Sequence, residues 1–439
     1  MQVILSHSGK QHSYHVAKAL YDSGVLDCFY TSSYITNSWL QRYLLKSGNT
    51  YFTRRFIEGL PGSKVNANWR FEFKEILYRK LFSKSSLSGM AVYSRDMKFD
   101  HYISRQLNRN SVFRMAEHSP KVNQNFLAFS ESNSEIFWGF QGSCFESLKA
   151  AKKTGIYTIC EQAATYIGFY KKILEEEKNL NPEWADSIDS IDYPPEYEKR
   201  LHAEPFLADH VLVASKFSKQ SLIESGMDSS KISILPLAAD LTKIPYSNIK
   251  KKVHNGPLKI LYVGRITQAK GIKYLLTAMQ NLSKSDFELT LIGNIQGKGN
   301  ALNSFHGYYN HIKGLSQKEL FEKYQEYDIL VNPSVSEGFG LVIIEAMAAG
   351  LPVITTTHTM GPEIIKNGIN GYLVPIRDSK SIAIALDTFR NKHSEEIYKM
   401  QSAARESALT YSWDQYALKL KSFLNDLQIH ESVLNPNYV

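Results

Sequence analysis

Residues 333–350 read PSVSEGFGLVIIEAMAAG, and this stretch predicts a turn followed by a buried helix. Serine and glycine are frequent in its first half, whereas the half after Gly340 is apolar on every side, which is typical of a helix enclosed in a core. Glu345 lies in the middle of that helix. Without a partner, an enclosed carboxylate is strongly destabilising or binds a proton. We therefore expect Glu345 to meet either an arginine or lysine of the core or a ligand with hydroxyl groups, such as a ribose diol.

Short apolar segments alternate with helical patterns on both sides of this stretch. Such alternation predicts parallel sheets covered by helices on both faces. The predicted strands are residues 3–6, 136–140, 157–161 and 210–215 in the first half, and 258–263, 287–292, 328–332, 352–356 and 372–374 in the second.

A polar, basic stretch with proline and glycine, KIPYSNIKKKVHNGP, separates the two halves. We therefore predict an α/β protein with two domains of similar size. The N-terminal domain takes residues 1–243, a linker takes 244–257, and the C-terminal domain takes 258–410; residues 411–439 follow as a last helix and tail.

The positive charge of the chain is concentrated in one segment. The 439 residues carry a formal net charge of +8, and residues 40–114 alone carry +10, with 15 Lys or Arg against five Asp or Glu. Aromatic residues are interspersed there, as in FEFKEILYRKLF, so we interpret residues 40–114 as a basic aromatic insert in the first domain. Two interpretations stay open. The insert rests on an anionic membrane surface, where each basic residue contributes about 1 kcal/mol, or it is a solvated helical face whose aromatic side chains belong to the core.

Several functional classes lack their sequence signatures. The three cysteines have no CxxC spacing, which argues against a disulfide framework and a cysteine zinc site. HExxH, GxSxG, EF-hand and Asp-x-Asp motifs are absent, so no metal site is predicted. Residues 293–300, GNIQGKGN, are one residue short of a phosphate loop. With no signal-peptide pattern and no apolar run of about 20 residues, we expect a cytoplasmic protein whose contact with a membrane is peripheral.

Two cations follow the first predicted strand of the second half. Gly264 ends strand 258–263, and Arg265 and Lys270 come before a helix that begins near Gly271. Cations at the carboxyl end of a parallel strand, beside a helix N-terminus, suit a diphosphate, because Arg can bond two phosphate oxygens and Lys adds a point charge. The alternative is a loop with ordinary surface cations.

The sequence resembles the family-4 retaining glycosyltransferases of the GT-B fold. The resemblance rests on the Gly264-Arg265 and Lys270-Gly271 pairs, on the two glutamates eight positions apart in PSVSEGFGLVIIEAMAAGLPVI, and on EIIKNGINGYLV. It is strong over residues 208–374, looser at the N-terminus and absent over 40–114. It implies two Rossmann-like domains that face each other across a cleft, with the C-terminal helix crossing back to the first domain.

The resemblance implies a role for each matching residue on the donor side. It assigns the donor site to Gly9, Gly264, Arg265, Lys270, Ile312, Glu337, Gly338, Phe339, Gly340 and Glu345. In the family, the residues matching Arg265 and Lys270 hold the donor diphosphate, and the glutamate matching Glu337 faces the transferred sugar. Negative charge develops on the leaving diphosphate as the anomeric C–O bond breaks, and one fixed donor there is worth about 3 kcal/mol. We therefore predict catalysis without a metal ion, with Arg265, Lys270 and Glu337 as catalytic residues.

The remaining donor contacts follow from the same resemblance. Glu345 takes the ribose hydroxyls, backbone near Ile312 contacts the base, and Gly9 lies across the cleft near the phosphates. The amides of residues 338–340 approach the sugar and phosphate, since glycine leaves the backbone unobstructed. The resemblance implies that anomeric configuration is retained by front-face attack, with a leaving phosphate oxygen accepting the proton of the acceptor hydroxyl.

One position departs from the family pattern. Many relatives carry a histidine just after the strand matching residues 157–160, whereas this chain reads YTICEQAAT, with Glu161 and Gln162 there. We predict that Glu161 is catalytic, orienting the sugar or the acceptor hydroxyl or acting as a base; the alternative is that it only keeps the loop in shape. Gln162, His12 and His15 are the candidates on the acceptor side.

Together these features predict a retaining, metal-independent glycosyltransferase. A nucleotide-diphosphate sugar binds in the C-terminal domain and a glycan or lipid-linked acceptor in the N-terminal domain; neither a cofactor nor nucleic acid is expected. The basic insert predicts a place in bacterial surface polysaccharide assembly, in the cytoplasm or on the inner face of the plasma membrane. Two other classes stay open: a GT-B nucleotide-sugar epimerase or phosphorylase, and a non-catalytic nucleotide-sugar-binding protein.

Overall fold

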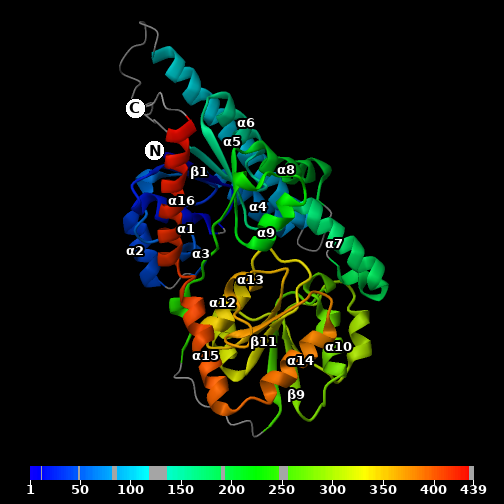
Figure 1. Ribbon diagram of the computed structural model, residues 1–439. Coiled ribbons are helices and arrows are strands. Elements are labelled where there is room, and N and C mark those ends of the chain that lie inside the picture. Colours follow the sequence, from blue (N-terminus) through cyan, green and yellow to red (C-terminus); the bar gives the residue numbers. More distant parts are fainter. Residues whose placement is uncertain are drawn as a thin grey trace.

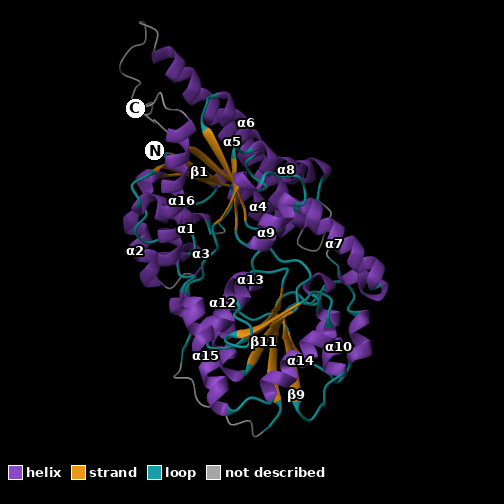
Figure 2. Cartoon of the chain, viewed as in Figure 1, coloured by secondary structure: helices purple, strands orange, loops and turns teal. Residues whose placement is uncertain are grey.

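The protein consists of two α/β domains, each built on a parallel sheet. The computed structural model describes residues 1–10, 12–47, 50–81, 87–117, 136–188, 193–246 and 256–434. The N-terminal domain is the upper one in Figure 1, and Figure 2 shows the strands of each sheet enclosed by helices. The predicted fold class is confirmed.

The N-terminal sheet has seven strands in the order β3-β2-β1-β4-β5-β6-β7. Each neighbouring pair runs parallel. Because the order reverses between β1 and β4, a crevice opens beyond the carboxyl ends of these two strands. The strands are β1 (Val3–His7), β2 (Leu26–Thr31), β3 (Val65–Ala67), β4 (Ile136–Phe140), β5 (Tyr157–Gln162), β6 (His210–Val213) and β7 (Ile232–Ile234).

The C-terminal sheet has six parallel strands in the order β10-β9-β8-β11-β12-β13. Its order reverses between β8 and β11, so the loops after these two strands border the corresponding crevice. Those loops carry most of the predicted donor residues; the others are Gly9 in the first domain, Ile312 in β10 and Glu345 in α12. The strands are β8 (Leu258–Val263), β9 (Phe287–Ile292), β10 (Asn310–Ile312), β11 (Ile329–Asn332), β12 (Val353–Thr356) and β13 (Gly371–Val374).

Helices cover both faces of each sheet. Those of the first domain are α1 (Ser13–Asp22), α2 (Ser38–Ser47), α3 (Thr50–Thr53), α4 (Trp69–Leu81), α5 (Leu87–Glu117), α6 (Phe145–Lys153), α7 (Ile167–Leu180), α8 (Pro195–Leu207) and α9 (Lys216–Ile223). Those that follow are α10 (Ile272–Gln280), α11 (Gln317–Lys323), α12 (Leu341–Ala348), α13 (Gly361–Ile364), α14 (Ser379–Arg390), α15 (Ser394–Leu409) and α16 (Trp413–Leu434). None of the helices in the described ranges combines the length and apolar character needed to cross a bilayer.

The predicted insert at residues 40–114 is partly built into the first domain. Its short strand β3 pairs with β2 at the edge of the sheet. Phe99 and Ile103 of α5 are fully buried and pack with Phe137 of β4 in one core cluster. Its exposed aromatic side chains lie mainly on α2 and α4.

Two segments cross between the domains besides the linker. Helix α16 returns to the first domain and runs beside α1 (Figure 1), where Tyr416, Leu420 and Leu424 join the same core cluster as β1. In the other direction, the 3-10 helix Pro182–Ser187 after α7 places Trp184 in the core of the C-terminal domain. The domains are therefore tied together on both sides of the cleft.

Candidate active site

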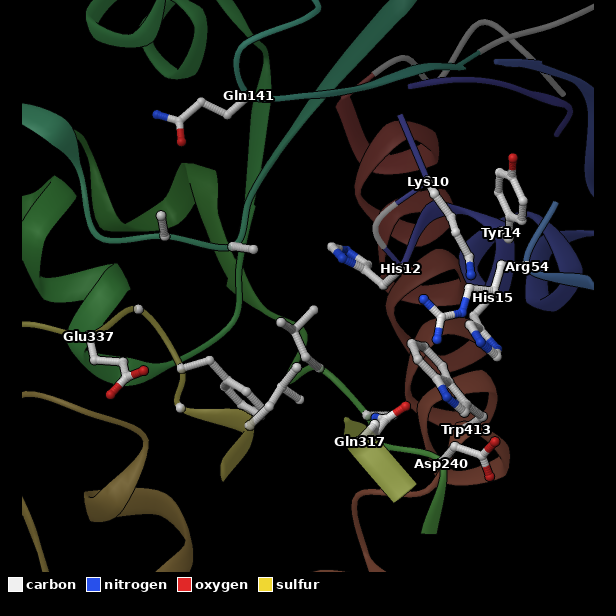
Figure 3. Close-up of a pocket in the computed structure, with 18 of the residues that line it drawn as sticks. Lys10, His12, Tyr14, His15, Arg54, Gln141, Asp240, Gln317, Glu337 and Trp413 are labelled. Atoms are coloured by element: carbon white, nitrogen blue, oxygen red, sulfur yellow. The ribbon is translucent and has the colours of Figure 1, made fainter. Parts of the chain in front are cut away.

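A cavity of about 1900 Å³ lies between the two domains. Of the residues singled out in the sequence, it is lined by His12, His15, Arg265, Lys270, Glu337, Gly338, Phe339 and Gly340. Figure 3 shows Glu337 on one side and Lys10, His12, His15 and Arg54 of the first domain on the other. The other candidates do not line this cavity; they are Gly9, Glu161, Gln162, Gly264, Ile312 and Glu345.

The loop after β8 presents its cations through a short 3-10 turn. The Thr267 side chain accepts a hydrogen bond from the amide of Ala269 and caps the turn that ends at Lys270. Gly271 follows with φ of 70°, and a Cβ there would lie 2.0 Å from the carbonyl oxygen of Pro333. Only glycine fits both the left-handed backbone and this close approach. Lys270 is thereby held against the segment that contains Glu337.

Lys270 and Glu337 form an ion pair at the cavity wall. Lys270 Nζ lies 2.7 Å from Glu337 Oε1, and the side chains are 22% and 18% exposed. Glu337 Oε2 accepts hydrogen bonds from Asn332 Nδ2 at 3.1 Å and Ser334 Oγ at 2.8 Å. Burial favours the protonated acid, but the charge and hydrogen bond of Lys270, with Ser334 and Asn332, bring the pKa of Glu337 below its usual value. Glu337 is therefore an anchored carboxylate and Lys270 an oriented cation.

Gly338 is a point of contact between the domains. A Cβ at this position would lie 2.4 Å from the carbonyl oxygen of Ala163, in the loop after β5. The Gly338 carbonyl accepts hydrogen bonds from Ser215 Oγ at 2.5 Å and Ser218 Oγ at 3.0 Å, both of the first domain. The glycine predicted to expose its amide to a ligand thus also allows the first domain to approach. Gly340, with φ of 95°, forms the N-cap of α12.

Glu345 meets neither an arginine nor a lysine of the core among the described residues. Its partner there is the Tyr324 hydroxyl, which donates to Oε2 at 3.3 Å. Burial raises the pKa of Glu345 to about 7, and this one hydrogen bond offsets little of the effect. Leu341, one turn earlier on the same face of α12, lines the cavity. The partly buried carboxylate therefore lies just beyond the cavity wall, poorly satisfied by the protein alone.

Glu161 lies behind the cavity wall. It is 5% exposed, and its Oε2 accepts a hydrogen bond from Trp138 Nε1 at 3.0 Å. Its Oε1 is paired with His12 Nε2, and His12 does line the cavity. The two candidates, 149 positions apart in sequence, thus form one unit in which Glu161 orients the His12 imidazole. This geometry does not support direct contact between Glu161 and a substrate.

Two further candidates shape loops near the cavity. Gln162 is fully buried and donates to the carbonyl oxygen of Ala164 at 3.1 Å, while its own side-chain oxygen accepts from Gln141. Gly9 is buried against the first domain, with Arg95 Nη2 3.1 Å from the site of a Cβ. Gln141, rather than Gln162, reaches the cavity.

His15 and Trp413 form an aromatic wall. Their rings are stacked, with centroids 3.8 Å apart and planes 4° from parallel, and both line the cavity. Burial first, then the charges of Lys10 and Lys243, lower the pKa of His15 to about 4, although Asp240 opposes them. His15 is therefore neutral at physiological pH. Trp413 is the first residue of α16 and brings that helix to the cavity wall.

The cavity residues of the first domain that sequence reasoning missed include Lys10, Arg54 and Gln141. Lys10 directly follows Gly9 in the first strand-to-helix turn, a position that could have drawn attention. Arg54 and Gln141 carry no local signal. Within the described ranges, no group of three or more His, Cys, Asp or Glu side chains is arranged to hold a metal ion; metal independence remains a prediction.

Part of the chain is similar in sequence to known glycosyltransferases. Residues 257–391 match the family model described as Glycosyl transferases group 1. The chain is 30% identical over 242 residues to an uncharacterised glycosyltransferase of Methanocaldococcus jannaschii, covering 50% of this chain and 61% of that protein. It is 27% identical over 228 residues to the putative colanic acid biosynthesis glycosyltransferase WcaL of Escherichia coli K12, covering 49% of this chain and 54% of WcaL. The matches thus span less than two thirds of these relatives.

Solved structures show the architecture of the whole chain. Anabaena HepE, determined in complex with UDP, matches with a TM-score of 0.57 at 12% identity, over 97% of this chain and 100% of that chain. The fold is GT-B. In a GT-B protein the two Rossmann-like domains face each other, and here the carboxyl ends of β1 and β8 lead into loops on opposite sides of the cavity. The predicted GT-B fold, including the crossover of α16, is confirmed.

Proposed function

We propose that the chain is a glycosyltransferase that moves a sugar from a nucleotide-diphosphate sugar to a glycan or lipid-linked acceptor. The observation that carries the proposal is the Lys270–Glu337 pair beside Arg265 in the cavity between two GT-B domains. The match to Glycosyl transferases group 1 supports it, as does HepE, whose structure contains UDP. The name of WcaL supports a place in the assembly of a bacterial surface polysaccharide.

The proposed reaction retains the anomeric configuration and uses no metal ion. The anomeric C–O bond to the diphosphate breaks, and the acceptor oxygen bonds to the same face of the anomeric carbon. The acceptor proton passes to a leaving phosphate oxygen. Arg265 and Lys270 stabilise the charge that develops on the diphosphate, and Glu337 orients Lys270 and faces the sugar. Such fixed cations need little reorganisation during the reaction.

A panel of nucleotide sugars, read by mass spectrometry, tests the proposal. With EDTA present, we expect transfer or slow hydrolysis of one donor, and the anomeric configuration of the product follows from NMR. An epimerised nucleotide sugar without an acceptor would instead indicate an epimerase. A cofactor absorbance band would indicate a phosphorylase, and binding without turnover would indicate a nucleotide-sugar-binding protein.

His12 and Glu161 should act as one unit in this reaction. We expect His12→Gln and Glu161→Gln each to lower transfer about tenfold or more, and the double variant to lower it no further than the stronger single change, because both changes disable the same imidazole. Nucleotide binding should stay unchanged in all three. His306→Gln, an exposed histidine outside the cavity, is the control. Additive losses would show that Glu161 works independently of His12.

We further propose that the protein works on the inner face of the plasma membrane through helix α2. Trp39 and Tyr43 are 66% and 58% exposed on this helix, and their rings are stacked 6.0 Å apart. Arg42 and Lys46 are exposed beside them. Aromatic and basic side chains on one helix suit an anionic lipid surface, because rings enter the interface while cations meet headgroups.

Flotation with vesicles tests the role of α2. We expect the protein to float with phosphatidylglycerol vesicles and not with phosphatidylcholine vesicles. The Trp39→Ser, Tyr43→Ser double variant should bind about tenfold less, since it removes two large apolar anchors. Leu418→Ser, which removes a side chain 61% exposed on α16, should bind normally. Equal binding by the double variant and the wild type would exclude α2 as the membrane contact.

A further inference from the structure

Positive charge on the cavity wall exceeds what a donor diphosphate requires. Six cations and three carboxylates line the cavity; they are Lys10, Arg54, Lys243, Arg265, Lys270 and Lys318, with Glu58, Asp240 and Glu337. Two of the carboxylates are engaged in ion pairs. Glu337 binds Lys270, and Asp240 binds Lys243 at 2.6 Å. The excess on the wall of the first domain comes from Lys10 and Arg54.

Lys10 and Arg54 lie close together on that wall. Figure 3 shows their charged ends directed toward one another, across the cavity from Glu337. Neither side chain forms an ion pair or hydrogen bond with another residue of the described ranges. Partial burial, followed by the charges of Arg54, Arg55 and Lys243, lowers the pKa of Lys10 from its usual 10.5 to about 8. Cations that repel each other in this way are stabilised when an anion binds between them.

The surroundings of this pair suit a sugar as well as an anion. Lys10 precedes α1, which carries His15, and the charge of Lys10 contributes to the low pKa of His15. The stacked His15–Trp413 rings thus line the same side of the cavity as Lys10 and Arg54, as Figure 3 shows. The flat face of an aromatic ring packs well against the apolar face of a pyranose. Because His15 is neutral, it adds no repulsion to the cations.

We propose that Lys10 and Arg54 bind an oxyanion on the acceptor, whose sugar ring packs against His15 and Trp413. The acceptor substrate is then a glycan or lipid-linked sugar that carries a phosphate or a carboxylate. Arg54 can bond two oxygens of such a group, and Lys10 contributes a point charge. Glu58, the third carboxylate of the cavity, is exposed, and solvent weakens its repulsion of the anion. This inference rests on the proposed function, because it assigns the acceptor side of that reaction.

Tryptophan fluorescence of the full chain tests the site, since Trp413 lies in it. We titrate with glucose 6-phosphate, glucuronate and glucose. Saturable binding of the phosphate sugar, the carboxylate sugar or both is expected, and the stronger of the two identifies the source of the oxyanion. Glucose should bind at least about tenfold more weakly, because it lacks the charge-assisted hydrogen bonds.

Variants locate the binding site of these probes. The Lys10→Gln, Arg54→Gln double variant should bind the charged sugars about tenfold or more weakly than the wild type. Arg54→Lys, which keeps a positive charge at this position, should bind them more tightly than the double variant but less tightly than the wild type. Lys18→Gln is the matched control on α1, since Lys18 pairs with Asp22 and does not line the cavity. Thermal melting monitored by circular dichroism confirms that each variant is folded.

Two results would overturn the proposal. One is binding of the charged sugars to the double variant with the affinity of the wild type. The other is binding that Lys270→Ala abolishes and the double variant keeps, because the anion would then occupy the donor side. Failure of the proposed function looks different: no nucleotide sugar would turn over, while the charged sugars would still bind at Lys10 and Arg54.

Discussion

Replacing Lys270 by alanine should lower sugar transfer about 100- to 1000-fold, the usual effect of removing one donor that stabilises developing negative charge. The change should also weaken binding of the nucleoside diphosphate, because Lys270 is a preoriented cation of the cavity wall. It removes the ion-pair partner of Glu337 as well; among the described residues, Asn332 and Ser334 then remain as the side chains that donate to this carboxylate. The measurement is steady-state transfer with the donor identified in the panel, together with calorimetric binding of the corresponding nucleoside diphosphate.

A second variant separates the effect of removing the Lys270 charge from the effect of breaking its ion pair with Glu337. Glu337→Gln keeps Lys270, and the amide oxygen can still accept from Asn332 and Ser334, although the bond from Lys270 is lost. Nucleotide binding should therefore survive while transfer falls. Lys298→Ala, an exposed lysine of the same domain outside the cavity, should behave as the wild type. Turnover within threefold of the wild type in Lys270→Ala would refute the assignment of Lys270 to the leaving group.

The fold was largely predictable because its signals are local. Each strand of the second sheet except β10 corresponds to a short segment that the sequence predicts as a strand, and the left-handed Gly271 and Gly340 mark the turns that lead into helices. Strand β3 was not predictable, since three residues reading Val-Asn-Ala carry no alternation. It forms because the edge of β2 offers unpaired backbone groups.

The candidate site was predictable only where its residues belong to recognisable sequence motifs. Lys270 and Glu337 belong to two motifs of one domain, whereas His12 and Glu161 meet because β1 and β5 both flank β4 in the sheet. The role of Trp413 depends on where the crossing helix α16 begins, because Trp413 is its first residue. No pattern within a single segment could reveal that an aromatic residue of the last helix stacks on His15.

The loop after β8, which carries Lys270, is tied firmly to the first domain. Glu177 of α7 is fully buried and accepts hydrogen bonds from Gln268 Nε2 at 2.9 Å, from Tyr274 and from Arg377. Arg377 adopts a φ of 62°, the positive value that non-glycine residues rarely take. Gln268 lies two positions before Lys270, so the cation loop is held in place by a helix of the other domain. Such an arrangement combines side chains separated by up to 200 positions, which sequence patterns cannot reveal.

Replacing Glu345 by glutamine should weaken nucleotide binding about tenfold or more, because a carboxylate accepting two ribose hydroxyls forms charge-assisted hydrogen bonds that the amide cannot match. The same change should raise the melting temperature at pH 8. Folding raises the pKa of Glu345 from 4.5, its ordinary value in the unfolded chain, to about 7. The ionised carboxylate therefore lowers the free energy of unfolding, and this loss of stability develops as the pH rises from about 4.5 to about 7. Glutamine removes that cost. A loss of binding combined with a gain of stability is expected of a residue kept for a ligand.

The pH dependence of binding gives the sharper test of the same residue. If only the ionised carboxylate binds the ribose, the dissociation constant of the nucleoside diphosphate should be constant above pH 8 and rise about tenfold per unit well below pH 7. That dependence should disappear in Glu345→Gln and persist in Glu322→Gln, an exposed glutamate of α11. Because diphosphate protonation contributes near pH 6, inorganic pyrophosphate is titrated in parallel and its dependence subtracted. An unchanged pH profile in Glu345→Gln would mean that the ribose lies elsewhere and that Glu345 serves only its contact with Tyr324.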